Sequence, residues 1–155
     1  MARPVAFVDT SVFCNILAVP HMHQDHSSVL AELTQRRKTH DLILPVTAVI
    51  ETGNHIAQIA DGRLRRSCAE KFSAVLRMVV ERKAPWTLNR VEWDEAYLLD
   101  LVGGAGTGAT LVDLAVQHLG CGDLSILAER NRYLARTTGT TAEIWTLDGQ
   151  LASYS

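Results

Sequence analysis

The sequence has 155 residues, of which 47% are hydrophobic and 21% are charged, with a formal net charge of −2. This length suits a single domain over residues 1–155 and allows a sizeable hydrophobic core. The near-neutral balance neither requires nor excludes a nucleic-acid partner. No apolar run reaches the length of about 18 residues that a transmembrane helix needs, so no membrane association is expected.

The N-terminal residues lack the apolar stretch of a signal peptide, which favours a cytoplasmic protein. The three cysteines, Cys14, Cys68 and Cys121, are odd in number and widely spaced. This pattern indicates reduced thiols, and without a Cys-x-x-Cys pair it does not suggest a zinc site.

Short apolar runs alternate with amphipathic stretches along the chain. In chain order we expect a strand over 4–8, helices over 11–18 and 23–38, a strand over 41–44, helices over 46–60 and 64–82, a strand over 86–89, helices over 92–102, 109–119 and 123–136, and a strand over 143–148. Ser11 and Thr47 are the expected N-caps of two of these helices. Strands that alternate with helices predict an α/β fold with a parallel sheet.

Two aspartates end predicted strands. Asp9 follows the first strand and Asp148 ends the last one. Right-handed crossovers bring the carboxyl ends of parallel strands to one edge of the sheet, where ligands bind in such folds. Both carboxylates should therefore face the same crevice.

Two further acids can join them at this edge. Glu51 lies about one turn into the helix that follows the second strand, and Asp123 opens a helix after the turn "GCG". Four carboxylates that converge would repel one another unless cations lie between them, and Mg²⁺ or Mn²⁺ prefer such oxygen ligands. Two such ions about 4 Å apart can cleave a phosphodiester in line.

Each of these acids also has a purely structural interpretation. Asp9 or Asp123 could cap a helix, Glu51 could lie on a solvated helix face, and Asp148 could belong to an Asp-Gly turn. Asp113, in "TLVDLAV", competes with Asp123 as the third acid, although the glycine turn before Asp123 favours the latter.

Four segments together resemble the motifs of the PIN domain family. They are "FVDTSV" at 7–12, "LPVTAVIE" at 44–51, "GDLSILAER" at 122–130 and "WTLD" at 145–148. The chain departs from the family pattern at Ser11, where asparagine is frequent, and in a longer interval between Asp123 and Asp148.

This resemblance implies a three-layer α/β/α sandwich with a central parallel sheet and the activity of a Mg²⁺- or Mn²⁺-dependent ribonuclease. It implies that Asp9, Glu51, Asp123 and Asp148 are the catalytic and metal-binding residues, supported by Thr10, Ser11 and Thr146. At this size the chain is similar to the VapC-like toxins of toxin–antitoxin pairs. Such a toxin would cleave RNA, form a homodimer and be inhibited by a small antitoxin protein.

Three arginines, Arg63, Arg65 and Arg66, lie together near a predicted helix start, where positive charge opposes the helix dipole. They could contact RNA phosphates or an acidic partner, or form a solvated face. The segment "HMHQDH" is expected to be a solvated helix start, and "GGAGTG" a mobile loop.

Two other functions remain in view. A degenerate PIN module would keep the fold and bind RNA or a partner without catalysis, and metal binding would separate it from the enzyme. A phosphotransfer protein fits less well, because Ser11 stands where a phosphatase of this build needs a second aspartate, and the paired acids of a receiver domain are missing.

Overall fold

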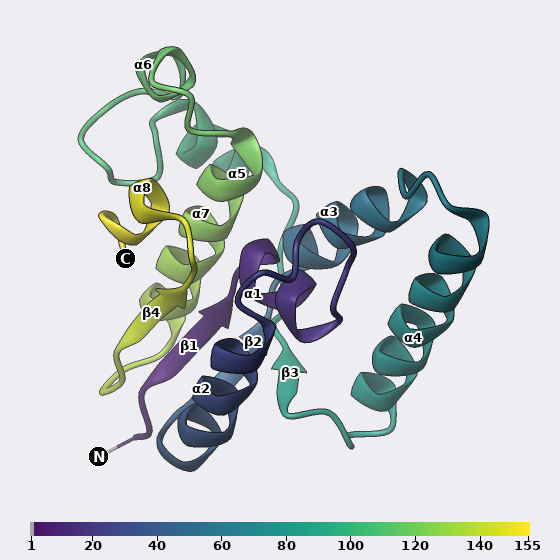
Figure 1. Cartoon of the computed structure of the whole chain (residues 1–155). Helices are drawn as coiled ribbons and strands as arrows, with labels where there is room; N and C mark the ends of the chain where they lie inside the picture. The colour runs from purple at the N-terminus through teal and green to yellow at the C-terminus, as the bar shows by residue number, and fades with distance from the viewer. Residues whose placement is uncertain (1) are drawn as a thin grey trace.

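The computed structural model describes residues 2–155, which form four strands and eight helices (Figure 1). The strands are β1 (Val5–Val8), β2 (Asp41–Leu44), β3 (Trp86–Leu88) and β4 (Ala142–Trp145). The helices are α1 (Thr10–Ile16), α2 (His26–Thr39), α3 (Val46–Ala57), α4 (Gly62–Val80), α5 (Glu95–Val102), α6 (Leu111–Val116), α7 (Cys121–Arg136) and α8 (Gly149–Ala152).

The four strands form one parallel sheet in the order β3-β2-β1-β4. The register pairs Val5 of β1 with Asp41 of β2 on one side and with Ala142 of β4 on the other. Strand β1 is therefore interior, and its carboxyl end lies between the carboxyl ends of two neighbours. The backbone N–H of Asp9 continues this pairing by donating to the carbonyl of Trp145 at 3.0 Å.

Alternate residues of the strands point to two hydrophobic cores, one on each face of the sheet, because successive side chains of a strand face opposite sides. Ala6 and Val8 pack against residues of α1–α4, whereas Val5 and Phe7 pack against residues of α5–α8. This is the layered α/β/α arrangement expected from the alternation of strands and helices, and that expectation is confirmed.

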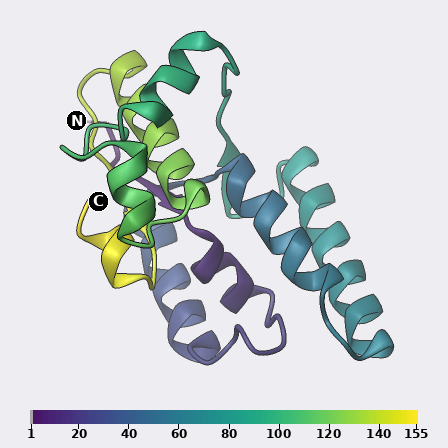
Figure 2. The ribbon, with the colours of Figure 1, turned by 90° about the horizontal axis from the view of Figure 1, so that it is seen from above.

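Helix α4 packs against α3 and β3, so the pair α3–α4 lies at the side of the molecule that carries β3 (Figures 1 and 2). Helices α5 and α7 contact each other on the opposite face, and α7 also contacts β4. Among the described residues, no helix combines the length and apolar character that crossing a bilayer requires.

Several element boundaries differ from the expected ones. Helix α1 begins at Thr10 with Asp9 at its N-cap position, and α3 begins after Pro45, so neither Ser11 nor Thr47 is the N-cap. Proline suits this position because it has no N–H to leave unsatisfied. The last strand ends at Trp145 instead of Asp148, and helix α8 follows, which the sequence did not predict.

The glycine-rich loop between α5 and α6 is a tight turn. Gly104 has a φ of 83°, and a Cβ at this position would lie 1.7 Å from the carbonyl oxygen of Ala109. Only glycine fits such a close approach of two backbone segments. The following helix is shorter than expected because His118 adopts a left-handed φ of 64°, which ends α6 soon after Val116.

Candidate active site

Asp9 lies at the carboxyl end of β1 and is only 3% exposed. Its Oδ2 accepts hydrogen bonds from the hydroxyls of Ser11 at 2.8 Å and Thr146 at 2.7 Å. Its Oδ1 is buried and has no hydrogen-bond partner. Although Asp9 occupies the N-cap position of α1, its side chain does not cap the helix, so the capping interpretation is wrong. A buried carboxylate oxygen without a partner is costly, so the unpaired Oδ1 calls for an explanation.

The hydroxyls around Asp9 are themselves held by backbone groups. The N–H of Leu147 donates to Ser11 Oγ at 3.0 Å, and the N–H of Asp148 donates to Thr146 Oγ1 at 3.0 Å. Each hydroxyl is thereby directed to give its own proton to Asp9. The turn after β4 thus fixes the orientation of a carboxylate that lies at the end of β1.

Glu51 enters the site from the first half of α3. Its Oε1 accepts a hydrogen bond from Thr10 Oγ1 at 2.8 Å. On its other side it lies against Gly122 of α7, where a Cβ would come within 2.7 Å of Glu51 Oε2. The Glu51 carboxylate can therefore lie this close to α7 only because residue 122 has no side chain.

Asp123 lies in the first turn of α7, one residue after Gly122. Burial, together with the negative charges of Asp9, Asp148 and Glu51, raises the pKa of the Asp123 carboxyl from its ordinary 3.8 to about 7. Electrostatic repulsion from all three partners shows that the four carboxyl groups lie in one neighbourhood.

Asp148 has two roles in this arrangement. Its Oδ1 caps α8 by accepting from the N–H groups of Gln150 at 2.8 Å and Leu151 at 3.2 Å. The turn interpretation of Asp148 thus describes part of its environment correctly. The charge of Asp148 nevertheless raises the pKa of Asp123, so Asp148 belongs to the same acidic group. Because Asp148 is exposed, it lies at the rim of that group.

The chemistry of these side chains suits a hard divalent cation, because they offer carboxylate oxygens and one of them is buried without a partner. As the side chains stand, no three His, Cys, Asp or Glu side chains within residues 2–155 are grouped tightly enough to enclose a metal ion. The four acids therefore form a common neighbourhood whose carboxylates would have to draw together around an ion.

Asp113 and the three arginines near residue 65, which the sequence also offered as candidates, do not belong to this acidic group. Asp113 closes a capping box with Thr110 at the start of α6, and its Oδ2 accepts from the Thr110 hydroxyl at 2.9 Å. Arg65 and Arg66 are engaged at the junction of α3 and α4, the first with the carbonyl of Ile59 at 2.8 Å and the second with Glu70 at 2.9 Å. Arg63, close by, is exposed.

The sequence did not indicate the contact between Gly122 and Glu51 or the bond from Thr10 to Glu51. The only available signal was the pair of glycines in "GCGD", which predicted a tight turn. In the structure these glycines belong to the start of α7, and Gly122 acts through its closeness to another helix.

No family model matches the chain, and no curated protein matches it in sequence. Among solved structures it is similar to a chain in the crystal structure of VapBC2 from Rickettsia felis bound to a DNA fragment from their promoter. That match has a TM-score of 0.50 and 12% identity, and it covers 92% of this chain and 99% of the other. The likeness concerns the fold, which is consistent with a PIN-like sandwich.

Proposed function

We propose that this protein is a Mg²⁺- or Mn²⁺-dependent endoribonuclease that cleaves RNA phosphodiesters at the acidic group formed by Asp9, Glu51, Asp123 and Asp148. The observation that carries the proposal is the Asp9 carboxylate, one oxygen of which is buried without a partner. Beside it, the pKa of Asp123 is raised to about 7 by burial and by the three other acids. A site that concentrates negative charge at the ligand-binding edge of a parallel sheet suits divalent cations.

Each residue has a role in this proposal. Asp9, Glu51, Asp123 and Asp148 would hold the cations, which when bound would lower the pKa of a water and neutralise charge on the phosphate. Ser11 and Thr146 keep one Asp9 oxygen occupied, which would leave the other for the cation. Thr10 holds Glu51 in place from the start of α1.

The decisive experiment compares cleavage of a structured RNA pool by the wild type and by Asp9→Asn, with Mn²⁺ and with EDTA. We expect metal-dependent cleavage by the wild type that falls by at least 100-fold in Asp9→Asn, roughly the loss seen when a charge-stabilising group is removed. Asp113→Asn is the matched control, since this aspartate serves the capping box of α6, and it should cleave as the wild type does.

A degenerate module is the second candidate, and the absence of a preassembled metal group among the described residues favours it. Calorimetric titration with Mn²⁺ separates the two. Binding that is lost in Asp9→Asn supports the enzyme, whereas no binding together with no cleavage by pure wild type supports a module that binds RNA or a partner.

We further propose that the protein is the toxin of a toxin–antitoxin pair. The support is the fold shared with VapBC2 and an apolar groove of about 730 Å³ between α3, α4 and the segment after β3. Apolar side chains of the groove are strongly exposed: Ile50 is 58%, Trp93 73% and Val80 80% accessible. Exposed apolar surface of this kind suits a protein partner, either an antitoxin or a second copy in a homodimer.

A further inference from the structure

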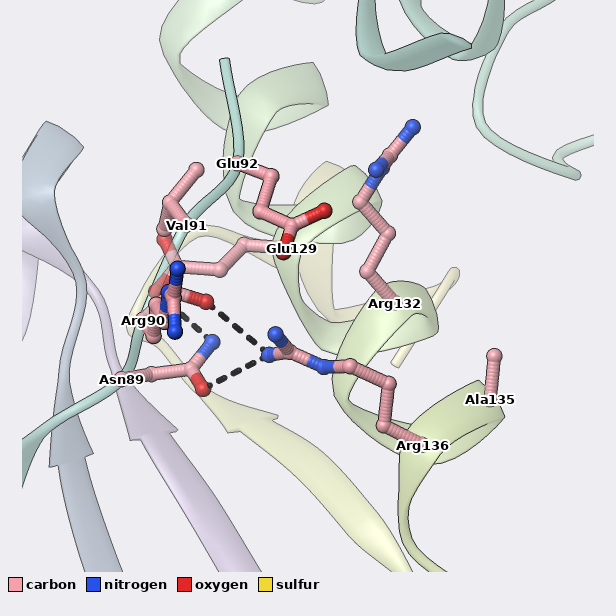
Figure 3. A pocket seen from close by; sticks show the side chains of 8 residues that line it. All are labelled: Asn89, Arg90, Val91, Glu92, Glu129, Arg132, Ala135 and Arg136. Atoms are coloured by element: carbon pink, nitrogen blue, oxygen red, sulfur yellow. Dashed lines mark hydrogen bonds between the residues drawn. The ribbon is translucent and has the colours of Figure 1, made fainter. Parts of the chain in front are cut away.

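A second pocket lies on the other face of the sheet from α4, between the segment after β3 and helix α7 (Figure 3). Its volume is about 340 Å³, near the lower end of the range for small-ligand sites of about 300–1,000 Å³. The charged and amide side chains of the lining come from both walls: Asn89, Arg90, Glu92, Glu129, Arg132 and Arg136.

Glu129 is the unusual residue of this pocket, because it is a carboxylic acid that is only 2% exposed. Its Oε1 accepts a long hydrogen bond of 3.3 Å from Asn89 Nδ2, and its Oε2 has no partner. Burial raises the pKa of Glu129 to about 7, although Asn89 and Arg136 act in the opposite direction. A buried acceptor without a donor calls for an explanation, and a bound N–H group would supply one.

This pocket is distinct from the acidic site. Glu129 follows Asp123 by six residues, which corresponds to about 9 Å along the axis of α7. The charges that raise the pKa of Asp123 are those of Asp9, Asp148 and Glu51, and Glu129 is not among them. The proposed cleavage chemistry makes no use of Glu129.

The mouth of the pocket is positively charged. Arg132 is paired with Asp94 and Asp100, but Arg90 and Arg136 have no acidic partner among the ion pairs within residues 2–155. Arg136 Nη2 donates to Asn89 Oδ1 at 3.1 Å and to the carbonyl of Arg90 at 2.9 Å, as the dashed lines in Figure 3 show.

These charges limit what can bind. A metal ion or an ammonium group would meet the two carboxyl groups of Glu92 and Glu129 but also three guanidinium groups, so the positive balance of the lining disfavours a cationic ligand. A neutral group with N–H donors can instead satisfy Glu129, and an attached anion can pair with Arg90 and Arg136. A nucleobase that carries a phosphate combines these two properties.

We propose that this pocket binds a guanine nucleotide, with the base donating to Glu129 and the phosphate lying against Arg90 and Arg136. Guanine presents two adjacent N–H donors, N1–H and N2–H₂, on its Watson–Crick edge, where adenine and cytosine place a ring acceptor beside the amino group. Proteins read single-stranded bases by hydrogen bonds along this edge. An ionised carboxylate has two acceptor oxygens, one for each of these donors. If the guanine comes from an RNA substrate, the inference rests on the proposed function. A free guanine nucleotide would offer the same chemistry.

The first test is calorimetric binding of guanosine 5′-monophosphate to the full chain in EDTA, so that no cleavage takes place. We expect binding that is roughly tenfold weaker for inosine 5′-monophosphate, which lacks the N2 amino group, and weaker still for adenosine 5′-monophosphate. Equal affinity for the guanine and adenine nucleotides, or no binding of any nucleotide or RNA probe, would overturn the proposal.

Variants then assign the two ends of the ligand. Glu129→Gln preserves the shape of the side chain and should weaken guanosine 5′-monophosphate binding at least tenfold, whereas Glu95→Gln, an exposed position on α5, should not. Arg90→Gln should weaken binding of the nucleotide but leave that of guanosine unchanged. A thermal melt of each variant shows that it is folded, and unaltered binding by folded Glu129→Gln contradicts the assignment.

Short RNAs identify the source of the base. A tetranucleotide with one guanine that binds more tightly than free nucleotide, with the same dependence on Glu129, points to the RNA substrate. Tighter binding of the free nucleotide points to a small-molecule ligand. Because these measurements need no metal, a failed cleavage assay leaves them valid, and the loss of cleavage in Asp9→Asn should not alter guanine binding.

Discussion

The two carboxylate oxygens of Asp9 have opposite surroundings, although they belong to one side chain. Two hydroxyls donate to Oδ2, and nothing donates to the buried Oδ1. A hydrogen-bond network that serves only stability would satisfy both oxygens. This asymmetry is the reason why we place Asp9 at the centre of the proposed site.

Asp123→Asn should stabilise the metal-free protein at pH 7. The folded pKa of Asp123 is about 7 against an ordinary 3.8, so between these values the folded state keeps a proton that the unfolded state has lost. The contribution of Asp123 to stability therefore falls as the pH rises from about 4 to 7. For a half-buried group we expect a gain of about 1–2 kcal/mol in the variant at pH 7.

Urea unfolding in EDTA at pH 4.5 and pH 7.5 measures this difference. The gap between variant and wild type should be larger at the higher pH. Asp113→Asn provides the comparison, since asparagine also caps helices. A gap that stays constant with pH would show that Asp123 is not held in its protonated form.

Gly122→Ala should impair the site with little effect on folding. The new Cβ would meet the Glu51 carboxylate at 2.7–2.8 Å, and that flexible group would have to move. We expect metal-dependent cleavage to fall at least tenfold and the unfolding free energy to change by less than about 1 kcal/mol. In Gly120→Ala, where nothing lies within 4 Å of the added atom, cleavage should be unaffected.

At the scale of elements, helix starts assemble the site. Helices α1, α3 and α7 begin at or near the carboxyl edge of the sheet, and each brings an acid or its hydroxyl partner to the candidate site. Helix α4 begins elsewhere, at the end of α3, where Asp61 accepts from the N–H groups of Arg63 and Leu64. Its cap should therefore matter for stability and not for catalysis.

Asp61→Ala tests this separation. Loss of an N-cap side chain should lower the unfolding free energy by about 1 kcal/mol, while Asp61→Asn, which retains a capping group, should change it much less. Cleavage per folded molecule should equal that of the wild type in both variants. A selective loss of cleavage in Asp61→Ala would mean that α4 influences the acidic site.

At the scale of the whole molecule, the groove beside α3 and α4 exposes apolar side chains that a partner could cover. Ile50→Lys and Trp93→Ser should each weaken self-association at least tenfold if the partner is a second copy. Leu99→Lys, at an apolar position on α5 that is 70% exposed and outside the groove, should have no such effect. Sedimentation velocity over a range of protein concentrations measures this, and a wild type that stays monomeric would favour an antitoxin as the occupant.

The sequence by itself determined the order of the four strands and of the helices before α8, and the placement of Asp9 and Asp148 at one edge, because both follow from local hydrophobic period and from the handedness of crossovers. Only the tertiary structure decided that Gly122 lets Glu51 approach α7, that Asp148 also caps a helix, and that Glu129 is buried with one oxygen free. These features depend on how helices distant in sequence pack against each other. Local patterns of residues do not encode such distances, since the same amphipathic helix can pack at several angles and depths.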